Sequence, residues 1–283
     1  MLKVLKAGFL SSIQDKGRFG FAALGVPNSG AMDSYSADLA NAILNNEVHE
    51  AVLEITLGNC EFQFLTDTVI CITGADVNAT INRLPISLNK KISIVKNDIL
   101  SFGKVNYGAR SYLALKGGFL TEKQLNSRSF YPNITKQALF KKGDFLPFQE
   151  YKEKSFENQS SIKTIRNHFT NTELTCYEGP EFGLLNDHQK EFLQNNTFTI
   201  SRDNSRMGYK LKEEMQNALP QILTSSVLPG TVQLTPSGVL IVLMRDCQTT
   251  GGYPRILQLT EKSINQLAQK TSLDFFKFVV KLI

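Results

Sequence analysis

The chain of 283 residues has few histidines and cysteines and no long hydrophobic run, and these absences exclude several classes of protein. Its four cysteines, Cys60, Cys71, Cys176 and Cys247, stand too far apart for a CxxC metal or redox motif, so buried free thiols are expected. The longest apolar run, 239–244, is far shorter than the ~20 residues of a membrane helix. The first residues lack the apolar stretch of a secretion signal. We therefore expect a soluble, cytoplasmic protein with no membrane partner.

No concentrated basic region is present. The formal charge of +5 comes from scattered Lys and Arg, and Lys90-Lys91 and Lys141-Lys142 are only pairs. Nothing resembles the basic stripe with interleaved aromatics that marks a nucleic-acid platform, so no nucleic acid is expected as a partner. With 42% hydrophobic and 20% charged residues, the composition is that of a globular protein with a sizeable core.

The common catalytic signatures are also missing. The sequence contains no GxxxxGK[ST] phosphate loop, no GxGxxG, no HExxH and no GxSxG. Its three histidines, His49, His168 and His188, lie far apart and beside no motif. His188 stands at helical spacing among apolar residues, which favours a structural role. No metal ligands are predicted.

Short strands separated by turns dominate the first half of the chain. The expected strands are 52–57, 61–64, 69–73, 78–81, 92–95, 99–102 and 111–116. One helix interrupts them, with Asp33 as its N-cap and apolar residues at helical spacing as far as Leu44. This pattern is typical of an all-β barrel or sandwich rather than of βαβ units.

The segment 149–167 is polar and aperiodic, and it is interpreted as a linker or exposed loop between a domain at 1–155 and a domain at 165–283. Strands are expected again at 173–177, 197–201, 232–234, 239–244, 256–259 and 275–281. Helices are expected at 182–193 and 261–269, the second capped by Thr260. Both halves are therefore mainly β, with a few short helices.

The segment 244–255 is the part of the chain that is richest in hydrogen-bond donors and acceptors. It joins two strand-like segments and contains Gly251-Gly252, which can turn sharply or let the backbone approach a ligand. A hairpin turn and a ligand-binding loop are both open interpretations. Further polar loops carry Arg18 and Arg206, and arginine forks suit carboxylates and phosphates, which indicates an anionic ligand. Taken singly, each such loop is more typical of a surface ion pair or a capped turn than of a binding site.

Several short sequence motifs of this chain match the motifs of one protein family, in the same order along the sequence. They are Gln14-Asp15-x-Gly17-Arg18, Asn28-Ser29-Gly30-Ala31-Met32-Asp33, Leu53-Glu54, Thr73-Gly74-Ala75, Ser127-Arg128-Ser129, Ser205-Arg206-Met207-Gly208-Tyr209, Pro229-Gly230-Thr231-x-Gln233 and Gln248-Thr249-Thr250-Gly251-Gly252-Tyr253-Pro254. The sequence is similar to the biotin-dependent carboxyltransferase-like family, which includes allophanate hydrolase subunit 2 and the C-type subunit of 5-oxoprolinase. Two cyclophilin-like β-barrel domains with a cleft between them are implied by this resemblance.

The resemblance also implies partners and a reaction. The B-type subunit of 5-oxoprolinase, which is related to a sporulation-kinase inhibitor, and an A-type subunit would use ATP with Mg²⁺ to open the lactam of 5-oxo-L-proline to L-glutamate. Relatives fused into urea carboxylase instead move a carboxyl group from carboxybiotin to urea. A third possibility is a non-enzymatic antagonist of the kinase-inhibitor-like partner. This chain has no Met-Lys-Met run for covalently attached biotin, which favours the lactam reaction.

The shared chemistry assigns candidate roles to the loop residues. The expected catalytic residues are Asp246, Arg206 and Glu54. The expected substrate- or ATP-binding residues are Arg18, Asp15, Gln233, Arg245, Thr249, Thr250, Gly251, Gly252, Tyr253 and Arg255. The chain departs from the family pattern at Asn126, Phe130 and Gln137-Ala138, where a glycine, a threonine and a Gly-Arg pair are usual.

Overall fold

The computed structural model describes residues 1–152 and 162–281, so part of the expected linker, 153–161, lies outside the described residues. The chain divides into two compact units. The first consists of Met1–Arg18 with Ser29–Phe169, and the second of Phe19–Asn28 with Thr170–Ile283. The expected cleft between two domains stays a prediction.

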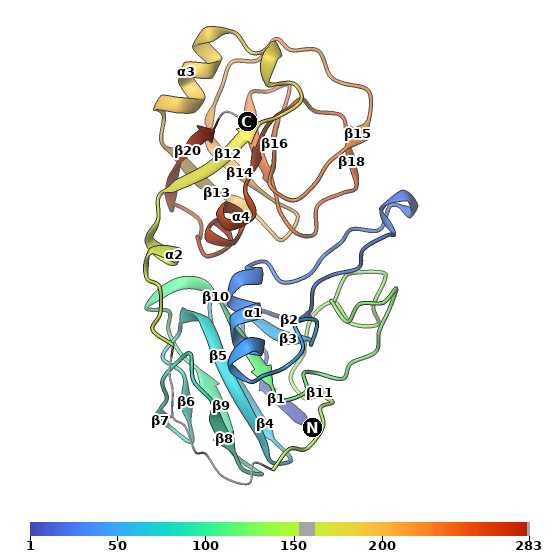
Figure 1. The fold of residues 1–283 in the computed structure, drawn as a ribbon, viewed down its shortest axis with the longest axis vertical. Helices are drawn as coiled ribbons and strands as arrows, with labels where there is room; N and C mark the ends of the chain where they lie inside the picture. Colours follow the sequence, from blue (N-terminus) through green and yellow to red (C-terminus); the bar gives the residue numbers. More distant parts are fainter. Residues whose placement is uncertain (153–161, 282–283) are drawn as a thin grey trace. The chain divides into compact units, whose positions relative to one another are not determined.

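Two antiparallel sheets form the first unit (Figure 1). The larger has the strand order β11-β1-β4-β9-β6-β7 and the smaller β2-β3-β10-β5-β8. Their bounds are β1 Leu2–Lys6, β2 Leu10–Gln14, β3 Val52–Thr56, β4 Cys60–Phe64, β5 Thr68–Asp76, β6 Thr80–Ile81, β7 Leu84–Pro85, β8 Ile92–Ile94, β9 Ile99–Phe102, β10 Tyr107–Leu115 and β11 Phe145–Leu146. Both sheets contribute to one core, with Phe62 and Leu100 from the larger and Ile72 and Leu113 from the smaller.

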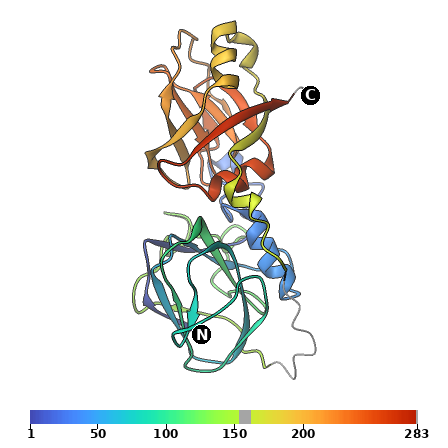
Figure 2. The ribbon, with the colours of Figure 1, turned by 90° about the vertical axis from the view of Figure 1, so that its left-hand side faces the viewer.

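Helix α1, Ser34–Ile43, covers the outer face of the smaller sheet (Figures 1 and 2). Alternate residues of a strand point to opposite faces, so one face of β5 enters the shared core and the other packs on α1. Ala37 and Ala40 of the helix accordingly lie in one cluster with Cys71 and Tyr112 of the sheet. As the sequence predicts, Asp33 caps the helix, and its side chain accepts a hydrogen bond from the Ser36 amide at 3.2 Å.

The second unit is a closed barrel with the strand order β12-β19-β16-β17-β14-β13-β20 (Figure 1). The bounds are β12 Glu173–Glu178, β13 Phe198–Asn204, β14 Gly208–Glu214, β16 Thr231–Leu234, β17 Val239–Leu243, β19 Arg255–Leu259 and β20 Phe275–Lys281. A parallel pairing of β12 with β20 closes the barrel, and the remaining pairs are antiparallel. A separate two-stranded sheet joins β15 Ser225–Ser226 to β18 Thr250–Gly251. The predicted mainly β fold with few short helices is confirmed.

Two short helices of the structure, η1 Ala22–Leu24 and α2 Asn167–Thr170, were not predicted, and one predicted helix is interrupted. The helix expected at 182–193 is wrong, because Leu185 is extended, with φ −72° and ψ 139°, and Asn186 begins a new helix. A 3₁₀ turn, η2 Phe182–Leu184, is therefore followed by α3 Asp187–Asn195. His188 is exposed rather than packed on an apolar face. The other helices are η1 Ala22–Leu24, α2 Asn167–Thr170 and α4 Glu261–Ala268, the last capped by Thr260 as predicted.

All four cysteines are free and buried, as the sequence predicts. Burial raises the pKa of Cys71, Cys176 and Cys247 to about 12 and that of Cys60 further, so these thiols stay protonated and unreactive.

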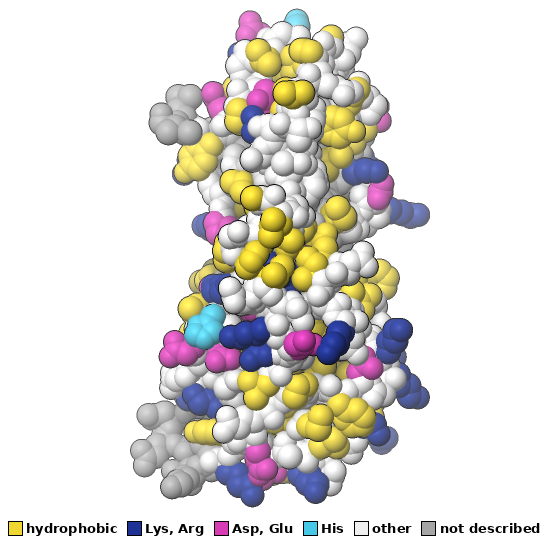
Figure 3. Space-filling model, turned by 90° about the vertical axis from the view of Figure 1, so that its right-hand side faces the viewer, with side chains coloured by type: hydrophobic (Ala, Val, Ile, Leu, Met, Phe, Trp, Pro, Cys, Tyr) yellow, Lys and Arg dark blue, Asp and Glu magenta, His cyan; other side chains and the backbone are white. Residues whose placement is uncertain are grey.

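On the face shown in Figure 3, Lys and Arg side chains are interspersed with Asp and Glu. None of the described helices has the length and hydrophobicity that a bilayer crossing requires.

Candidate functional site

The segment 244–255 joins β17 to β19, and the topology excludes the hairpin interpretation. β16 lies between β17 and β19 and pairs with both, so the two strands that flank the segment are not neighbours. The segment crosses the end of β16 and forms β18 on its way. Gly251 and Gly252 therefore belong to a crossover loop whose short strand pairs with Ser225 and Ser226.

An ion pair anchors the beginning of this loop. The Arg206 guanidinium donates from Nε to Asp246 Oδ2 at 2.7 Å and from Nη2 to Oδ1 at 3.0 Å, a bidentate arrangement. The Asp246 amide donates to the Arg206 carbonyl at 2.9 Å, which ties the β13–β14 turn to the loop. The Arg206 and Asp246 side chains are 11% and 9% exposed, so the pair is largely shielded from water. Two residues predicted to be catalytic thus contact each other.

A buried amide continues the site from this ion pair. Gln233 on β16 is 1% exposed, and its Oε1 accepts from Gln248 Nε2 at 3.4 Å. Its Nε2 is buried and has no hydrogen-bond partner among the described residues. A Cβ added to Gly251 would lie 2.6 Å from that nitrogen, so the amide points at the glycine backbone. Gln233, Gln248 and Gly251 thus lie together, and Asp246, held by Arg206, comes two residues before Gln248 in the same loop; we call these five residues the amide strip.

Gly251 and Gly252 provide a matched test of this packing. Gly251→Ala is expected to displace the Gln233 amide and to lower the free energy of unfolding by roughly 1–3 kcal/mol, because the added methyl group overpacks a buried site. Gly252→Ala is the control, since the nearest atom to its added Cβ, the Ile222 carbonyl oxygen, is 3.5 Å away. Urea unfolding of both variants measures the difference. Equal stability of the two would contradict the proposed contact.

The two arginines of the loop itself are held by glutamates of the same unit. Arg245 donates to Glu261 at 3.2 Å and to Asn265 at 2.9 Å. Arg255 donates to Glu181 from Nη2 at 2.8 Å and from Nε at 3.0 Å. The expected anion clamps are thus already neutralised by carboxylates, and an anionic ligand would have to compete with these partners.

The remaining predicted binding residues lie along the loop. Thr249 is half-buried and its carbonyl accepts from the Val227 amide at 3.2 Å, whereas Thr250 is exposed. The Gly252 carbonyl accepts from the Ile222 amide at 3.1 Å. Tyr253 is 37% exposed. Thr250 and Tyr253 are therefore the accessible side chains beside the amide strip.

The Arg255–Glu181 pair predicts a pH dependence. Hydrogen bonds from Arg255 hold the pKa of Glu181 below its ordinary value. A carboxylate with a lowered folded pKa stabilises the protein above the unfolded value, about 4.3, and this contribution disappears as the pH falls through the folded value. Glu181→Gln is expected to cost roughly 1–2 kcal/mol at pH 7 and much less at pH 3. Urea unfolding at both pH values tests this, with the exposed Glu178→Gln as control. An equal cost at both pH values would contradict it.

In the first unit, Asp15 is the centre of a second polar cluster. Its Oδ1 accepts from Ser127 Oγ at 2.6 Å, from Ser129 Oγ at 2.7 Å and from the Gly17 amide at 2.8 Å. Its Oδ2 accepts from the Arg128 amide at 2.6 Å. Two motifs far apart in the sequence therefore meet at one carboxylate, and this arrangement gives Asp15 a structural role.

Arg18 belongs to the same cluster. It is fully buried and donates to the Ser129 carbonyl. Its guanidinium is therefore directed into the first unit rather than toward solvent. The ligand-binding roles predicted for Asp15 and Arg18 stay predictions.

Glu54 belongs to a third cluster, which is fully buried. Its Oε2 accepts from the Met32 amide at 2.8 Å and from Tyr112 Oη at 2.9 Å, and its Oε1 lies 3.9 Å from Arg110 Nε. The Asp33 amide donates to Tyr112 Oη at 2.8 Å. Burial, followed by the charges of Glu54 and Asp33, holds the pKa of Tyr112 well above its ordinary value, so the phenol keeps the proton that it donates.

One histidine in this region was not predicted to be part of any cluster. His168 Nε2 lies 2.8 Å from Asp33 Oδ2, and both residues are buried. Sequence reasoning missed this contact because the partners are 135 positions apart and no motif surrounds the histidine. The Glu54 cluster is thus a buried network around the start of α1, and the catalytic role predicted for Glu54 stays a prediction.

Comparisons with known proteins decide which family these motifs belong to. Residues 24–280 match the family model described as "Carboxyltransferase domain, subdomain A and B". The chain belongs to this carboxyltransferase-domain family. It is 31% identical over 275 residues to the C-type subunit of the Escherichia coli 5-oxoprolinase, covering 95% of this chain and 87% of that relative. It is 28% identical to the protein of the same name from Haemophilus influenzae, with the same coverage.

A solved structure supports the fold of the carboxyltransferase-domain family. The urea amidolyase of K. lactis superposes with a TM-score of 0.84 at 26% identity, covering 99% of this chain. This chain spans only 18% of that much longer protein. The mainly β architecture described above is therefore that of a carboxyltransferase domain.

The described residues of this carboxyltransferase-family chain contain no group of three or more His, Cys, Asp or Glu side chains arranged to hold a metal ion. Mg²⁺ typically keeps several waters and binds through one or two carboxylates together with substrate phosphates. The expected use of ATP with Mg²⁺ stays a prediction.

Proposed function

We propose that this chain is the C-type subunit of an ATP-dependent 5-oxoprolinase and opens the lactam of 5-oxo-L-proline together with a B-type and an A-type subunit. The observation that carries the proposal is the similarity to the E. coli protein of that name over nearly the whole of both chains. The motif set that includes Gln233 and 248–254 lies within the matched range. Activity is expected only from the assembled complex.

The chemistry begins with an unreactive amide carbonyl. Transfer of the γ-phosphoryl group of ATP to the lactam oxygen, with release of ADP, makes the carbonyl carbon electrophilic. Water then adds to that carbon, the C–N bond breaks and the amine takes a proton, which leaves an acyl phosphate. A second water then cleaves this acyl phosphate and gives L-glutamate and phosphate. Such a sequence depends on positioning the reactants and on stabilising negative charge.

The amide strip is suited to part of this task. Gln233, whose Nε2 is buried beside Gly251, would hold the Gly251 backbone in place, so that the loop presents a fixed polar surface to the lactam. Asp246, oriented by Arg206, would take a proton from the attacking water. Thr250 and Tyr253 would contact the substrate from the exposed side of the loop. ATP would bring Mg²⁺ as its counter-ion.

Reconstitution tests the proposal. The chain is co-purified with its B-type and A-type partners, and glutamate is measured after addition of ATP and 5-oxoproline. The expected result is glutamate release that requires all three proteins and ATP. Formation of a stable complex without any turnover would favour the non-enzymatic antagonist, and failure to associate would remove the proposal altogether.

Carboxyl transfer is the second candidate. It is favoured by the family description and by the likeness to a urea amidolyase. This reaction would move a carboxyl group from carboxybiotin on a separate carrier protein to a urea-like acceptor. The discriminating arm of the assay supplies a biotinylated carrier and bicarbonate, and activity that depends on them would replace the lactam proposal.

A further inference from the structure

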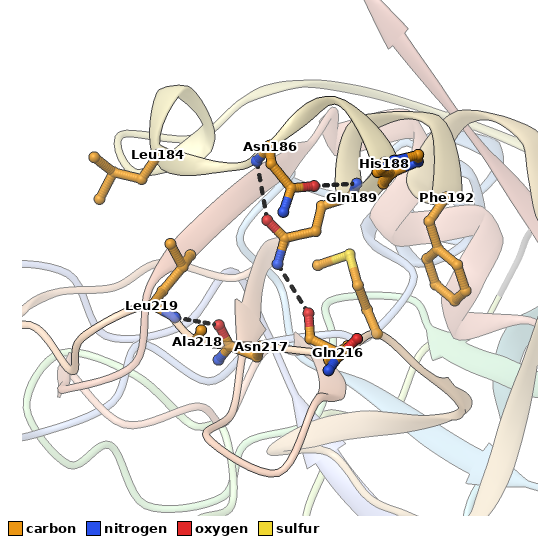
Figure 4. A pocket seen from close by; sticks show the side chains of 10 residues that line it. Leu184, Asn186, His188, Gln189, Phe192, Gln216, Asn217, Ala218 and Leu219 are labelled. Carbon is orange, nitrogen blue, oxygen red and sulfur yellow. Dashed lines mark hydrogen bonds between the residues drawn. The ribbon is translucent and has the colours of Figure 1, made fainter.

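A cavity of about 530 Å³ lies in the second unit, between α3 and the segment 215–219 that follows β14 (Figure 4). This volume is within the range of about 300–1,000 Å³ that small-molecule pockets occupy. None of the residues that line it belongs to the amide strip. It is therefore a separate feature of the barrel, which the proposed function does not use.

The helical wall of this cavity is fixed by hydrogen bonds. Asn186 and Gln189 form a capping box at the start of α3, with Asn186 Oδ1 accepting from the Gln189 amide at 2.9 Å and Gln189 Oε1 accepting from the Asn186 amide at 3.0 Å. Gln189 Nε2 then donates to the Gln216 carbonyl at 2.9 Å, which joins the helix to the opposite wall. Figure 4 shows Gln189 and Phe192 extending from α3 toward that wall.

The opposite wall is fixed to the barrel. The Met215 amide donates to the Gly238 carbonyl at 2.8 Å, and Asn217 Nδ2 donates to the Thr235 carbonyl at 2.9 Å. The Leu219 amide donates to Asn217 Oδ1 at 2.8 Å. Both walls are thus ordered before any ligand arrives, so ligand binding would not lose free energy in ordering them.

The lining contains no Lys, Arg, Asp or Glu. A charged ligand would lose its water without meeting an opposite charge, which is costly, whereas a neutral ligand would not. The apolar part of the lining includes the half-buried Phe192 ring, held edge-on against Phe198 at 5.8 Å between centroids, and the thioether of Met215. Thioethers and ring faces favour aromatic partners.

Polar groups at the rim complete the site. Among the described residues, the Gln216 side-chain amide and the His188 imidazole have no hydrogen-bond partner, and both are exposed to solvent. A primary amide such as that of Gln216 pairs best with a group that offers a donor and an acceptor side by side, as another amide does.

We propose that this cavity binds an uncharged aromatic or heteroaromatic molecule that carries an amide group. The ring would lie against Phe192 and Met215, and the amide would pair with Gln216. The proposal does not depend on the reaction proposed above, because the two sites share no residue.

Three molecules of the same shape but different charge test whether the cavity prefers a neutral amide. Benzamide is neutral, benzoate is its anionic counterpart and benzamidine its cationic one. The full chain is labelled at its methionine methyl groups, Met215→Leu identifies the Met215 signal, and each molecule is titrated by NMR at pH 8. Benzamide is expected to shift this signal saturably with a Kd of about 1 mM, which suits so small a ligand. The charged molecules are expected to bind at least about tenfold more weakly.

Amino-acid substitutions in and beside the cavity test whether benzamide binds there. Gln216→Ala, at an exposed position, is expected to weaken benzamide binding by roughly threefold to tenfold through loss of the amide pair, and Phe192→Ala to weaken it further. Gln194→Ala, on the same helix but outside the lining, is the control and is expected to change nothing. Absence of a saturable shift, equal binding of benzoate or benzamidine, or unchanged binding in Gln216→Ala would each overturn the proposal.

Discussion

Replacement of Glu54 by alanine is expected to lower the free energy of unfolding by about 3–5 kcal/mol, the cost of breaking a buried, charged, hydrogen-bonded cluster. The Met32 amide and the Tyr112 hydroxyl would lose their acceptor, and Arg110 would lose the carboxylate that lies 3.9 Å from its Nε. Urea unfolding measures the change.

The neighbouring glutamate provides the matched control for this experiment. Glu61 lies on β4 and is exposed, so Glu61→Ala is expected to change stability by less than about 0.5 kcal/mol. Tyr112→Phe removes only the hydroxyl that links Glu54 to the Asp33 amide, and it should fall between the two. A Glu54→Ala protein as stable as the Glu61→Ala protein would show that the cluster does not hold the first unit together.

The second large effect concerns activity. Asp246→Asn is expected to reduce ATP-dependent ring opening in the assembled complex by at least about 100-fold, the scale of general base catalysis. Asparagine keeps the shape of the side chain but cannot take a proton, and it removes the counter-charge of Arg206. The measurement is glutamate release at saturating ATP and substrate, with assembly of the complex checked in parallel.

Asp203 is the control, because it is an exposed aspartate on the adjoining strand β13 that pairs with Lys210. Asp203→Asn is expected to leave turnover unchanged. If Asp246→Asn assembled normally and retained full activity, Asp246 would be only a structural partner of Arg206.

Local patterns in the sequence were sufficient to predict much of the fold. Residues such as Phe62 and Phe64 alternate with polar neighbours along β4, and such alternation identifies a half-buried strand. Capping residues such as Asp33 and Thr260 identified two helix starts. The helix at 182–193 was wrong because its apolar spacing continues across Leu185, while the Asn186 cap restarts the helix.

Seven of the described strands were not predicted: β1, β2 and β14, and the two-residue strands β7, β11, β15 and β18. In β14, Tyr209 and Leu211 alternate with lysines, the mark of a half-buried strand, but Ser205–Tyr209 was interpreted only as a polar loop. A motif can thus begin in a turn and continue into a barrel strand. Polar motif residues therefore do not by themselves exclude regular structure.

The candidate site was predictable as a list of residues but not as a set of contacts. The Arg255–Glu181 and Arg206–Asp246 pairs join positions 74 and 40 residues apart, and no local pattern encodes such pairings. Those distant partners decide whether an arginine can bind an anionic ligand or is already paired with a carboxylate. The buried Nε2 of Gln233 likewise depends on how closely the Gly251 backbone approaches it.

The most direct test of the account is the balance of ADP and glutamate in the reconstituted complex. We predict that ADP and glutamate appear in equal amounts from ATP and 5-oxoproline when this chain is present, and that glutamate formation stops when it is left out. Glutamate formation at an unchanged rate without this chain, or none at all with all three proteins, ATP and 5-oxoproline present, would contradict it.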